Sequence, residues 1–212
     1  ACARHDDGSR SCWGQGVALG VGVSDGRSYN EPIRSSGESW DDLTTGGYSV
    51  CAIDDGVLSC FGTNFAYDAG QGTLGPVEVP TQVGTDTTWT QVDGGSSTMC
   101  GVNAGSLQCW GDNFVGEAGP NASTAGPMPV DANTDWFLAT VGETTGCGPR
   151  HGDEAYCWGT GGLPLGDGTS DGSANPVRAI GNFTDITNGA GHTCALATDQ
   201  SLQCWGLDQF GQ

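Results

Sequence analysis

The stretch GHTCALATDQSLQCWG, residues 191–206, decides the fold. Cys194 and Cys204 enclose a short polar segment, and Trp205-Gly206 follow the second cysteine directly. The stretch predicts a β-hairpin, with Cys-Ala-Leu as the first strand, Ala-Thr-Asp-Gln as the turn and Ser-Leu-Gln-Cys-Trp as the return strand. The end residues of such a hairpin face each other with Cα atoms about 4.5–5.5 Å apart, a separation that a disulfide accepts.

The same cysteine pair occurs five times. Eight or nine residues separate its members, whereas zinc sites favour two to four residues between paired ligands. We therefore expect five disulfides and no metal site, and with them an oxidising, extracellular compartment. The pairs are Cys2/Cys12, Cys51/Cys60, Cys100/Cys109, Cys147/Cys157 and Cys194/Cys204.

The pairs mark a sequence repeat. Their first cysteines are 49, 49, 47 and 47 residues apart, a period typical of propellers and solenoids. An aromatic residue stands eleven positions before the first cysteine, a glycine stands five before it, and an aromatic residue and a glycine follow the second. These aromatic residues are Trp40, Trp89, Trp136 and Phe183, and the glycines are Gly46, Gly95, Gly142 and Gly189. The aromatic residues after the second cysteine are Trp13, Phe61, Trp110, Trp158 and Trp205, and their regular spacing predicts core packing between blades.

Each full repeat predicts four short strands. The first is the aromatic segment, such as residues 88–92, and the cysteine hairpin supplies the second and third, with turns such as Asp54-Asp55-Gly56. The fourth is a Pro-Val segment, as at Pro176-Val177. Proline cannot donate to a strand ladder, so we expect it at the start of this strand or on the sheet's edge. The sequence thus predicts one all-β domain over residues 1–212, a β-propeller of about five repeats of roughly 48 residues.

Composition excludes several classes of function. The formal net charge is −19, and six arginines supply every fixed positive charge because the chain has no lysine. Nucleic acid binding needs a basic face, so we expect no such partner. No apolar run is long enough to cross a bilayer, so we expect no membrane insertion. The chain starts with neither a methionine nor a signal peptide, as a processed product or an excerpt would.

The sequence resembles the regulator of chromosome condensation repeats, which build β-propellers. The resemblance rests on NGAGHTCALATDQSLQCWG at 188–206 and on LPLGDGT at 163–169. The cysteine pair in every repeat is similar to the secreted bacterial variants, while the acidic, lysine-free composition differs from the chromatin-bound exchange factor. The family usually closes its ring with seven blades, and its fold carries unrelated functions.

The expected strands leave both ends incomplete, with three strands in the first and last repeats and four in each of the others. Three outcomes stay open. The chain is an excerpt of a longer closed propeller, or a ring of five blades with an imperfect seam, or a subunit whose end blades are completed by the next copy. The last arrangement builds a fibre head to tail.

Candidate catalytic and metal-binding residues have structural explanations. His192 is expected to pack and to form hydrogen bonds, as in the family motif, and His5 and His151 to lie solvated in hairpin turns. The Gly-x-Ser-x-Gly tracts at 22–26 and 168–172 lie in glycine-rich loops rather than at the strand-to-helix turn of a nucleophile elbow. No cysteine is unpaired, and several aspartates, such as Asp25, Asp55 and Asp167, stand beside glycine in turns. We therefore expect no enzyme and no catalytic residue, although a two-carboxylate glycosidase site would need only two carboxylates brought together by loops.

Two further features allow modification or ion binding. The loop 166–171, GDGTSD, offers oxygen ligands for Ca²⁺ but lacks the spacing and the terminal Glu of an EF-hand, so we expect no cofactor. Asn121-Ala122-Ser123 and Asn182-Phe183-Thr184 are N-glycosylation sequons. The first lies in a loop that would accommodate a glycan, and the second directly precedes an expected strand.

The sequence therefore favours an extracellular structural or interaction protein, a disulfide-stapled propeller scaffold whose partner is itself, in a head-to-tail fibre. The alternative is a secreted, closed propeller that binds another extracellular protein, as an inhibitor or adhesin does. A glycan-active enzyme is the third hypothesis.

Overall fold

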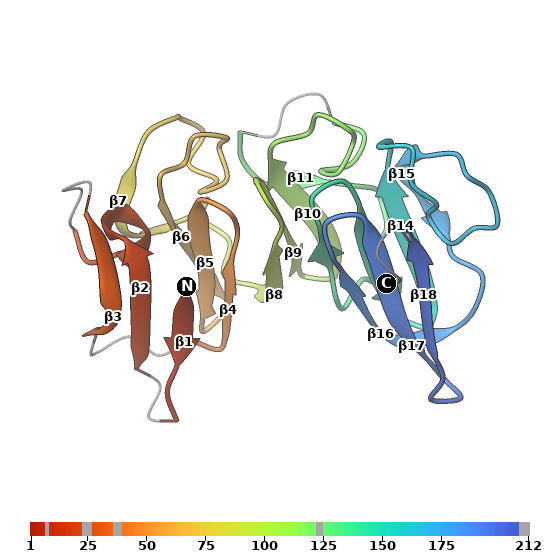
Figure 1. The fold of residues 1–212 in the computed structure, drawn as a ribbon, viewed down its shortest axis with the longest axis horizontal. Coiled ribbons are helices and arrows are strands. Elements are labelled where there is room, and N and C mark those ends of the chain that lie inside the picture. The colour runs from red at the N-terminus through yellow and green to blue at the C-terminus, as the bar shows by residue number, and fades with distance from the viewer. Residues whose placement is uncertain (7–8, 23–26, 36–39, 122–124, 208–212) are drawn as a thin grey trace.

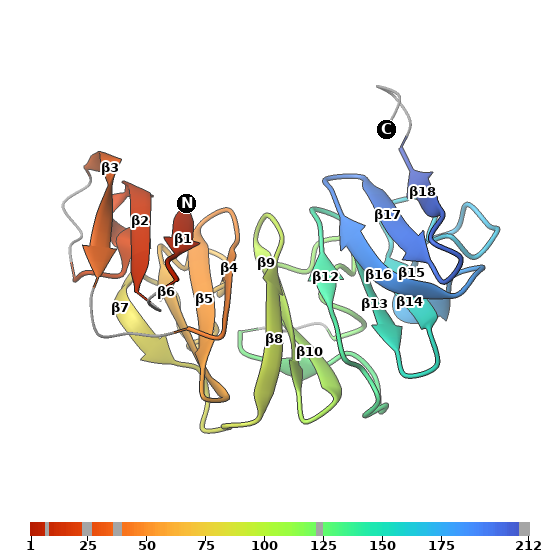
Figure 2. The ribbon, with the colours of Figure 1, turned by 90° about the horizontal axis from the view of Figure 1, so that it is seen from below.

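Five antiparallel sheets make up the chain. The computed structural model describes residues 1–6, 9–22, 27–35, 40–121 and 125–207. Within these ranges there are eighteen strands and one short 3-10 helix, η1 (Gly16–Leu19). The sheets lie side by side in chain order (Figures 1 and 2), with three strands in the first and fifth and four in each of the others. This is the all-β repeat architecture that the sequence predicts, with the expected strand count.

The strands follow one another in space almost as they do in sequence. The first sheet contains β1 (Cys2–Arg4), β2 (Arg10–Gln15) and β3 (Ser28–Ser35), and the second β4 (Asp42–Thr45), β5 (Ser49–Asp54), β6 (Val57–Gly62) and β7 (Val77–Gln82). The third contains β8 (Trp89–Gly94), β9 (Thr98–Asn103), β10 (Ser106–Gly111) and β11 (Met128–Pro129). The fourth contains β12 (Thr140–Val141), β13 (Gly146–Arg150), β14 (Glu154–Gly159) and β15 (Ser173–Arg178), and the fifth β16 (Phe183–Asn188), β17 (His192–Ala197) and β18 (Leu202–Gly206).

A disulfide staples the central hairpin of every sheet. The strand register places the two cysteines of each pair directly opposite one another, and each pair forms a disulfide with a Cα–Cα distance of 4.1 Å. The five bonds are Cys2–Cys12, Cys51–Cys60, Cys100–Cys109, Cys147–Cys157 and Cys194–Cys204. The hairpin turns use left-handed residue pairs, as at Asp55-Gly56 and Ala104-Gly105, which suit two-residue hairpin loops.

The core lies between neighbouring sheets. One cluster joins the disulfide of the second sheet, with Ile53 and Leu58, to Trp89 and Trp110 of the third. The two indole rings meet edge to face at 5.8 Å, a favourable aromatic geometry. Equivalent clusters join the third sheet to the fourth and the fourth to the fifth. The aromatic residues that recur in sequence are thus wedges between sheets, as expected.

The repeated glycines lie where two repeats approach most closely. A Cβ built on Gly95 would stand 2.1 Å from the carbonyl oxygen of Gly142, and one on Gly142 would stand 2.1 Å from that of Gly189. Neither distance is sterically possible, because real Cβ contacts start near 3 Å. Gly95 and Gly142 therefore permit backbone contact between successive repeats.

Polar side chains bridge the first strands of successive sheets. The Val92 amide donates to Oδ2 of Asp42 at 2.9 Å, and the Val141 amide donates to Oδ2 of Asp93 at 2.9 Å. The Gln91 side chain accepts from the Ala139 amide and donates to the Ala139 carbonyl. These side chains satisfy backbone groups at an edge that no strand covers.

The expected prolines lie in the outermost strand of each four-stranded sheet. Pro80, Pro129 and Pro176 belong to β7, β11 and β15, where the missing amide hydrogen interrupts no inner ladder. β15 extends from residue 173 to 178, so Pro176 is inside the strand rather than at its start. In the described part of the chain, none of the helices is long and apolar enough to cross a membrane.

Candidate functional site

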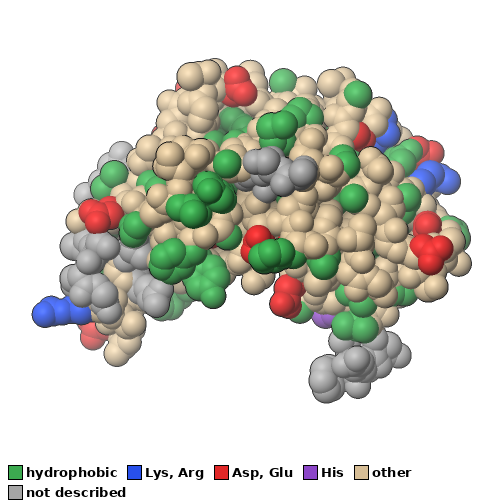
Figure 3. Space-filling model, turned by 90° about the horizontal axis from the view of Figure 1, so that it is seen from above, with side chains coloured by type: hydrophobic (Ala, Val, Ile, Leu, Met, Phe, Trp, Pro, Cys, Tyr) green, Lys and Arg blue, Asp and Glu red, His purple; other side chains and the backbone are tan. Residues whose placement is uncertain are grey.

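The most exposed aromatic residues gather at one end of the sheets. We call it the loop end: it carries the turns 46–48, 95–97, 142–145 and 189–191 and the connections 63–76, 112–121 with 125–127, and 160–172. Backbone hydrogen bonds join the two sets of loops, from the Thr63 amide to the Tyr48 carbonyl and from the Asp112 amide to the Ser97 carbonyl, both 2.9 Å. Figure 3 shows hydrophobic and acidic side chains across this end, with basic side chains only at its rim.

Phe65 and Phe114 are displayed at equivalent positions of two successive repeats. Each follows the aromatic residue after the second cysteine by four positions, and the side chains are 69% and 88% exposed. Tyr48, 49% exposed, makes an edge contact with Phe65 at 6.3 Å. Aromatic residues are enriched at protein interfaces, so this exposed set is a candidate interaction surface.

A network of hydrogen bonds fixes the loop that carries Phe114. The Glu117 carboxylate accepts from the amides of Phe114 at 3.2 Å and Val115 at 2.8 Å. The Asn113 side chain accepts from the Ala118 amide at 2.9 Å and donates to the Gly119 carbonyl at 3.0 Å. The backbone that carries Phe114 is therefore fixed, so binding of a partner to this residue would cost little backbone entropy.

A groove opens beside Phe114 between the third and fourth sheets. Its volume is about 240 Å³, and it is lined by Ser96, Ser97, Thr98, Asp112, Phe114, Val115, Glu117, Glu143 and Thr144. Three of these are acidic and none is basic. Burial raises the pKa of Asp112, because a carboxylate removed from water without a cation is destabilised.

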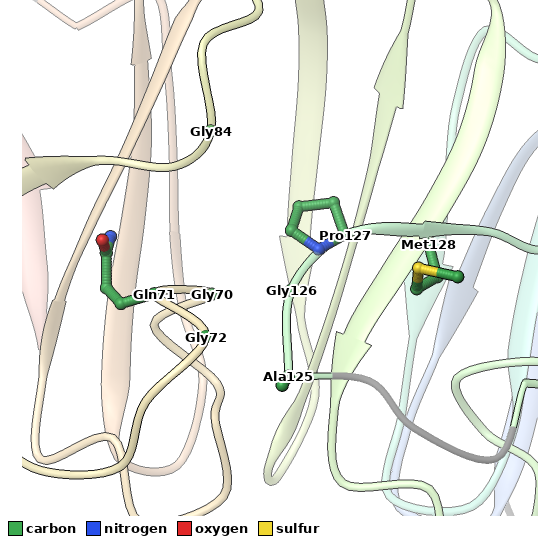
Figure 4. Close-up of a pocket in the computed structure, with 8 residues that line it drawn as sticks. All are labelled: Gly70, Gln71, Gly72, Gly84, Ala125, Gly126, Pro127 and Met128. Atoms are coloured by element: carbon green, nitrogen blue, oxygen red, sulfur yellow. The ribbon is translucent and has the colours of Figure 1, made fainter.

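A second cavity, of about 460 Å³, lies between the loops of the second and third sheets (Figure 4). Its lining is mainly glycine, with Ala125, Pro127 and Met128 as apolar members. Gln71, its polar side chain, donates to the carbonyls of Ala69 and Thr81. The lining contains no titratable or nucleophilic side chain. The cavity therefore offers space for a ligand but no catalytic group.

Asp68 is a buried carboxyl group next to the loop end. Its side chain is fully buried, and neither carboxyl oxygen has a hydrogen-bond partner within the described residues. Burial raises the pKa of Asp68, the charge of Asp112 adds to the shift, and the nearby Ser49 hydroxyl opposes it. The Asp68 carbonyl accepts from the Trp110 indole at 3.0 Å. The carboxyl group is enclosed, so a substrate would have no access to it.

The three histidines lie far apart in the chain and belong to different environments. His5 Nε2 lies 2.7 Å from the Ser11 hydroxyl in the first hairpin, and His151 stacks on Phe137 at 5.5 Å. Both are exposed, as expected for hairpin turns. His192 is half-buried and packs against Gly189, where an added Cβ would meet its ring at 2.5 Å. Its position matches the expected packing role.

The loop 166–171 is organised by its own hydrogen bonds. Asp167 Oδ1 accepts from the Thr169 amide at 2.9 Å and from the Thr169 hydroxyl at 2.8 Å. These bonds lower the pKa of Asp167. Within the residues that the structure describes, His, Cys, Asp and Glu form no group of three or more that would hold a metal ion.

The two sequons differ in exposure. Asn121 is half-buried and donates its side-chain amide to the Pro129 carbonyl at 2.8 Å, while Ala122 and Ser123 lie outside the described residues. Asn182 is exposed, although Phe183 beside it is fully buried and the Thr184 hydroxyl donates to the Leu196 carbonyl. The folded structure therefore presents Asn182 more openly than Asn121, the reverse of the order suggested by sequence.

Sequence reasoning missed the exposed aromatic pair and the acidic groove. A signal for the first was present, because Asn64-Phe65 and Asn113-Phe114 occupy the same register of two repeats. The groove gave no local signal, since Asp112 and Glu143 come from different repeats.

Comparison with known proteins supports the repeat assignment. A family model for the regulator of chromosome condensation (RCC1) repeat matches residues 183–212. None of the curated proteins matches the sequence significantly.

Solved structures match over most of the chain. Yeast RCC1 (Prp20), in a complex with Kap60, matches with a TM-score of 0.82 and 16% identity, over 98% of this chain and 54% of that one. Human WBSCR16 matches with a TM-score of 0.81 and 17% identity, over 96% and 61%. The ectodomain of the Arabidopsis thaliana receptor kinase ACR4 matches with a TM-score of 0.52 and 20% identity, over 79% and 53%. This chain thus spans little more than half the length of the solved chains it matches. The last sheet thus matches the regulator of chromosome condensation repeat, and the five sheets are arranged as in an RCC1-like β-propeller.

Proposed function

We propose that this chain is an extracellular, non-enzymatic scaffold, a single repeat domain over residues 1–212 that binds a protein partner through its loop end. The observation that carries the proposal is the display of Phe65 and Phe114, 69% and 88% exposed, at equivalent positions of successive repeats. Rigid, exposed aromatic side chains are typical anchors of protein interfaces.

Two findings support the extracellular part of the proposal. Five disulfides staple the sheets, and such bonds persist in oxidising compartments. One structural neighbour is the ectodomain of a receptor kinase. Another neighbour, yeast RCC1, is solved in a complex with the protein Kap60, which is a precedent for a protein partner. The proposed role requires no cofactor.

Site-specific photo-crosslinking tests the binding surface. Phe65 or Phe137 is replaced by p-benzoylphenylalanine, and each variant is expressed in the source cells. Phe137 is also exposed but belongs to the opposite, hairpin end, next to His151. We expect the protein in the culture medium and a crosslinked partner from position 65 that position 137 does not give. Retention inside the cell, or equal crosslinking from both positions, contradicts the proposal.

Secretion through a glycosylating pathway predicts modification of the sequons. We propose that Asn182 carries a glycan more completely than Asn121, because Asn182 is exposed while the Asn121 amide is engaged with the Pro129 carbonyl. The intact mass, compared with 21.6 kDa for the unmodified chain, measures occupancy. Asn182→Gln and Asn121→Gln assign any added mass to a site.

Head-to-tail self-assembly is the second candidate, and the exposed face of the fifth sheet favours it. Leu202 and Leu196 are 71% and 39% exposed. The residues equivalent to Leu202 in the second and third sheets, Leu58 and Leu107, are completely buried by the next sheet. A further sheet, from a second copy of this chain, would cover this face and give a fibre.

A further inference from the structure

We propose that the groove beside Phe114 binds an arginine or lysine side chain of an extended partner segment, with Phe114 as the aromatic anchor. The inference rests on the proposed function and names the chemistry of its partner. We choose a basic protein segment as the partner because the groove, its negative charge and the exposed Phe114 ring occur together.

The groove has two walls from different repeats. The turn 96–98 and the loop 112–117 of the third sheet form one wall, and Glu143 and Thr144 of the fourth sheet form the other. The Thr160 hydroxyl donates to the Val115 carbonyl at 2.7 Å and ties the first wall to the fourth sheet. The groove is therefore preformed, with a volume of about 240 Å³, large enough for one long side chain but too small for a folded element.

The charge of the groove is negative and uncompensated. Asp112 and Glu143 have no ion pair within the described residues, and none of the six arginines lines the groove. The Glu117 carboxylate is already engaged by two backbone amides, so Asp112 and Glu143 are the carboxylates left to meet a ligand. The whole chain carries −19, which adds long-range attraction for a cation.

Phe114 adds an exposed aromatic ring to the acidic groove. Its ring is 88% exposed while its backbone is fixed by Glu117. A guanidinium or ammonium group over such a ring gains a cation–π interaction, and its aliphatic stem covers the ring. The same pairing already occurs inside this chain, where the Arg10 guanidinium lies 4.3 Å from the centre of the Trp40 ring.

Fluorescence anisotropy on the oxidised 212-residue protein tests the inference. The probes are three labelled dodecapeptides, (Arg-Leu-Gly)4, (citrulline-Leu-Gly)4 and (Glu-Leu-Gly)4, at 150 mM NaCl. Citrulline keeps the shape of arginine and removes its charge. The test variants are Phe114→Ser and Glu143→Gln. Their matched controls are Phe137→Ser, an exposed aromatic residue at the hairpin end, and Glu78→Gln, an exposed glutamate on β7.

We expect the arginine probe to bind and the other two to bind at least about tenfold more weakly. Phe114→Ser should raise the Kd of the arginine probe about tenfold, as removal of an interface anchor does, and Glu143→Gln about threefold. The two control variants should leave the Kd within about twofold of the parent value.

Three results of the anisotropy measurements overturn the inference. The first is absence of binding by the arginine probe, and the second is equal binding of the citrulline probe, which would indicate an apolar groove. The third is an unchanged Kd of the arginine probe for Phe114→Ser, which would indicate general attraction to an acidic chain without an aromatic anchor. A partner crosslinked from position 65 whose contacting segment lacks arginine and lysine also overturns it, but leaves the proposed function standing.

Discussion

At the scale of the residue, the backbone of the next repeat leaves no room for a side chain at Gly95. Gly95→Ala places a methyl group 2.1 Å from the Gly142 carbonyl oxygen, so the third and fourth sheets must separate. We expect the free energy of unfolding to fall by about 2–3 kcal/mol, measured by urea denaturation. Gly126→Ala is the matched control, because its nearest neighbour would stand at an ordinary 3.5 Å. Equal losses in the two variants would contradict the steric explanation.

Asp68 gives a prediction about pH. Burial raises its pKa above the ordinary 3.8, so the folded state binds the proton more tightly than the unfolded chain. Its favourable contribution is present below about pH 3.8 and is lost as the pH rises through the folded-state pKa. Asp68→Asn removes this dependence and leaves an amide that can bond to the Ser49 hydroxyl. We expect the free energy of unfolding of the variant to exceed that of the parent by about 1 kcal/mol or more at pH 7. The difference should be smaller at pH 4.

Asp167→Asn is the control, because Asp167 should affect the pH dependence of the unfolding free energy in the opposite direction. Hydrogen bonds from Thr169 lower the pKa of Asp167, so its contribution is present above pH 3.8 and lost as the pH falls through the folded-state pKa. Unfolding free energies of both variants and the parent, measured from pH 3 to pH 8, give the two slopes. If Asp68→Asn has the same pH slope as the parent, the buried carboxyl group does not control this dependence.

At the scale of the element, the disulfide hairpin acts both as a covalent staple and as part of the core. Replacing Cys100 and Cys109 with alanine removes a staple that is completely buried against the fourth sheet. The covalent part is worth about 2–3 kcal/mol by the loop-entropy model, and lost packing adds about 1–2 kcal/mol. The same double substitution at Cys194 and Cys204, where Cys204 is exposed, should cost only the covalent part. Urea denaturation compares them, and equal losses would show that packing contributes nothing.

Most of the hairpin and its repetition could be predicted from sequence, because their causes are local. Cysteine spacing, turn residues and the Trp89 and Trp110 landmarks can all be recognised within the sequence of one repeat. The bridges from Asp42 to Val92 and from Asp93 to Val141 were not predictable, because their partners lie 48–50 residues away along the chain. A fourth strand at Pro129 was predicted, but not that β11 would have only two residues, since propensity does not show where an outer strand stops pairing.

At the scale of the whole molecule, the candidate site was harder to predict than the fold. Phe114 and Glu143 become neighbours of one groove only after two sheets pack. The burial of Asp68 likewise depends on the third sheet, whose Trp110 indole bonds to the Asp68 carbonyl. A repeating sequence specifies what all its copies share, which is the core. The groove instead combines residues of two copies, Phe114 from one and Glu143 from the next, so it has no signature within a single repeat.

The outer face of the fifth sheet provides the last prediction, which concerns self-association of the 212-residue chain. The position two residues before the second cysteine packs on the next sheet's aromatic pair: Leu58 contacts the cluster of Trp89 and Trp110, and Arg10 lies over Trp40 and Phe61. In the fifth sheet the same position is Leu202, 71% exposed. Burial of such a leucine is worth about 1.5–3 kcal/mol, so the purified chain should associate as its concentration rises. Sedimentation velocity measures this.

Leu202→Ser should weaken that association, whereas Leu74→Ser, at an exposed leucine of a connecting loop, should not. Self-association through β18 should also depend on salt. The chain carries a net charge of −19, so copies repel one another at low ionic strength. Association should therefore strengthen as NaCl is raised from 20 to 300 mM, the opposite of the arginine probe, whose binding should weaken. A chain that stays monomeric at every salt and protein concentration contradicts head-to-tail assembly, and leaves the loop end as the one binding surface proposed for this chain.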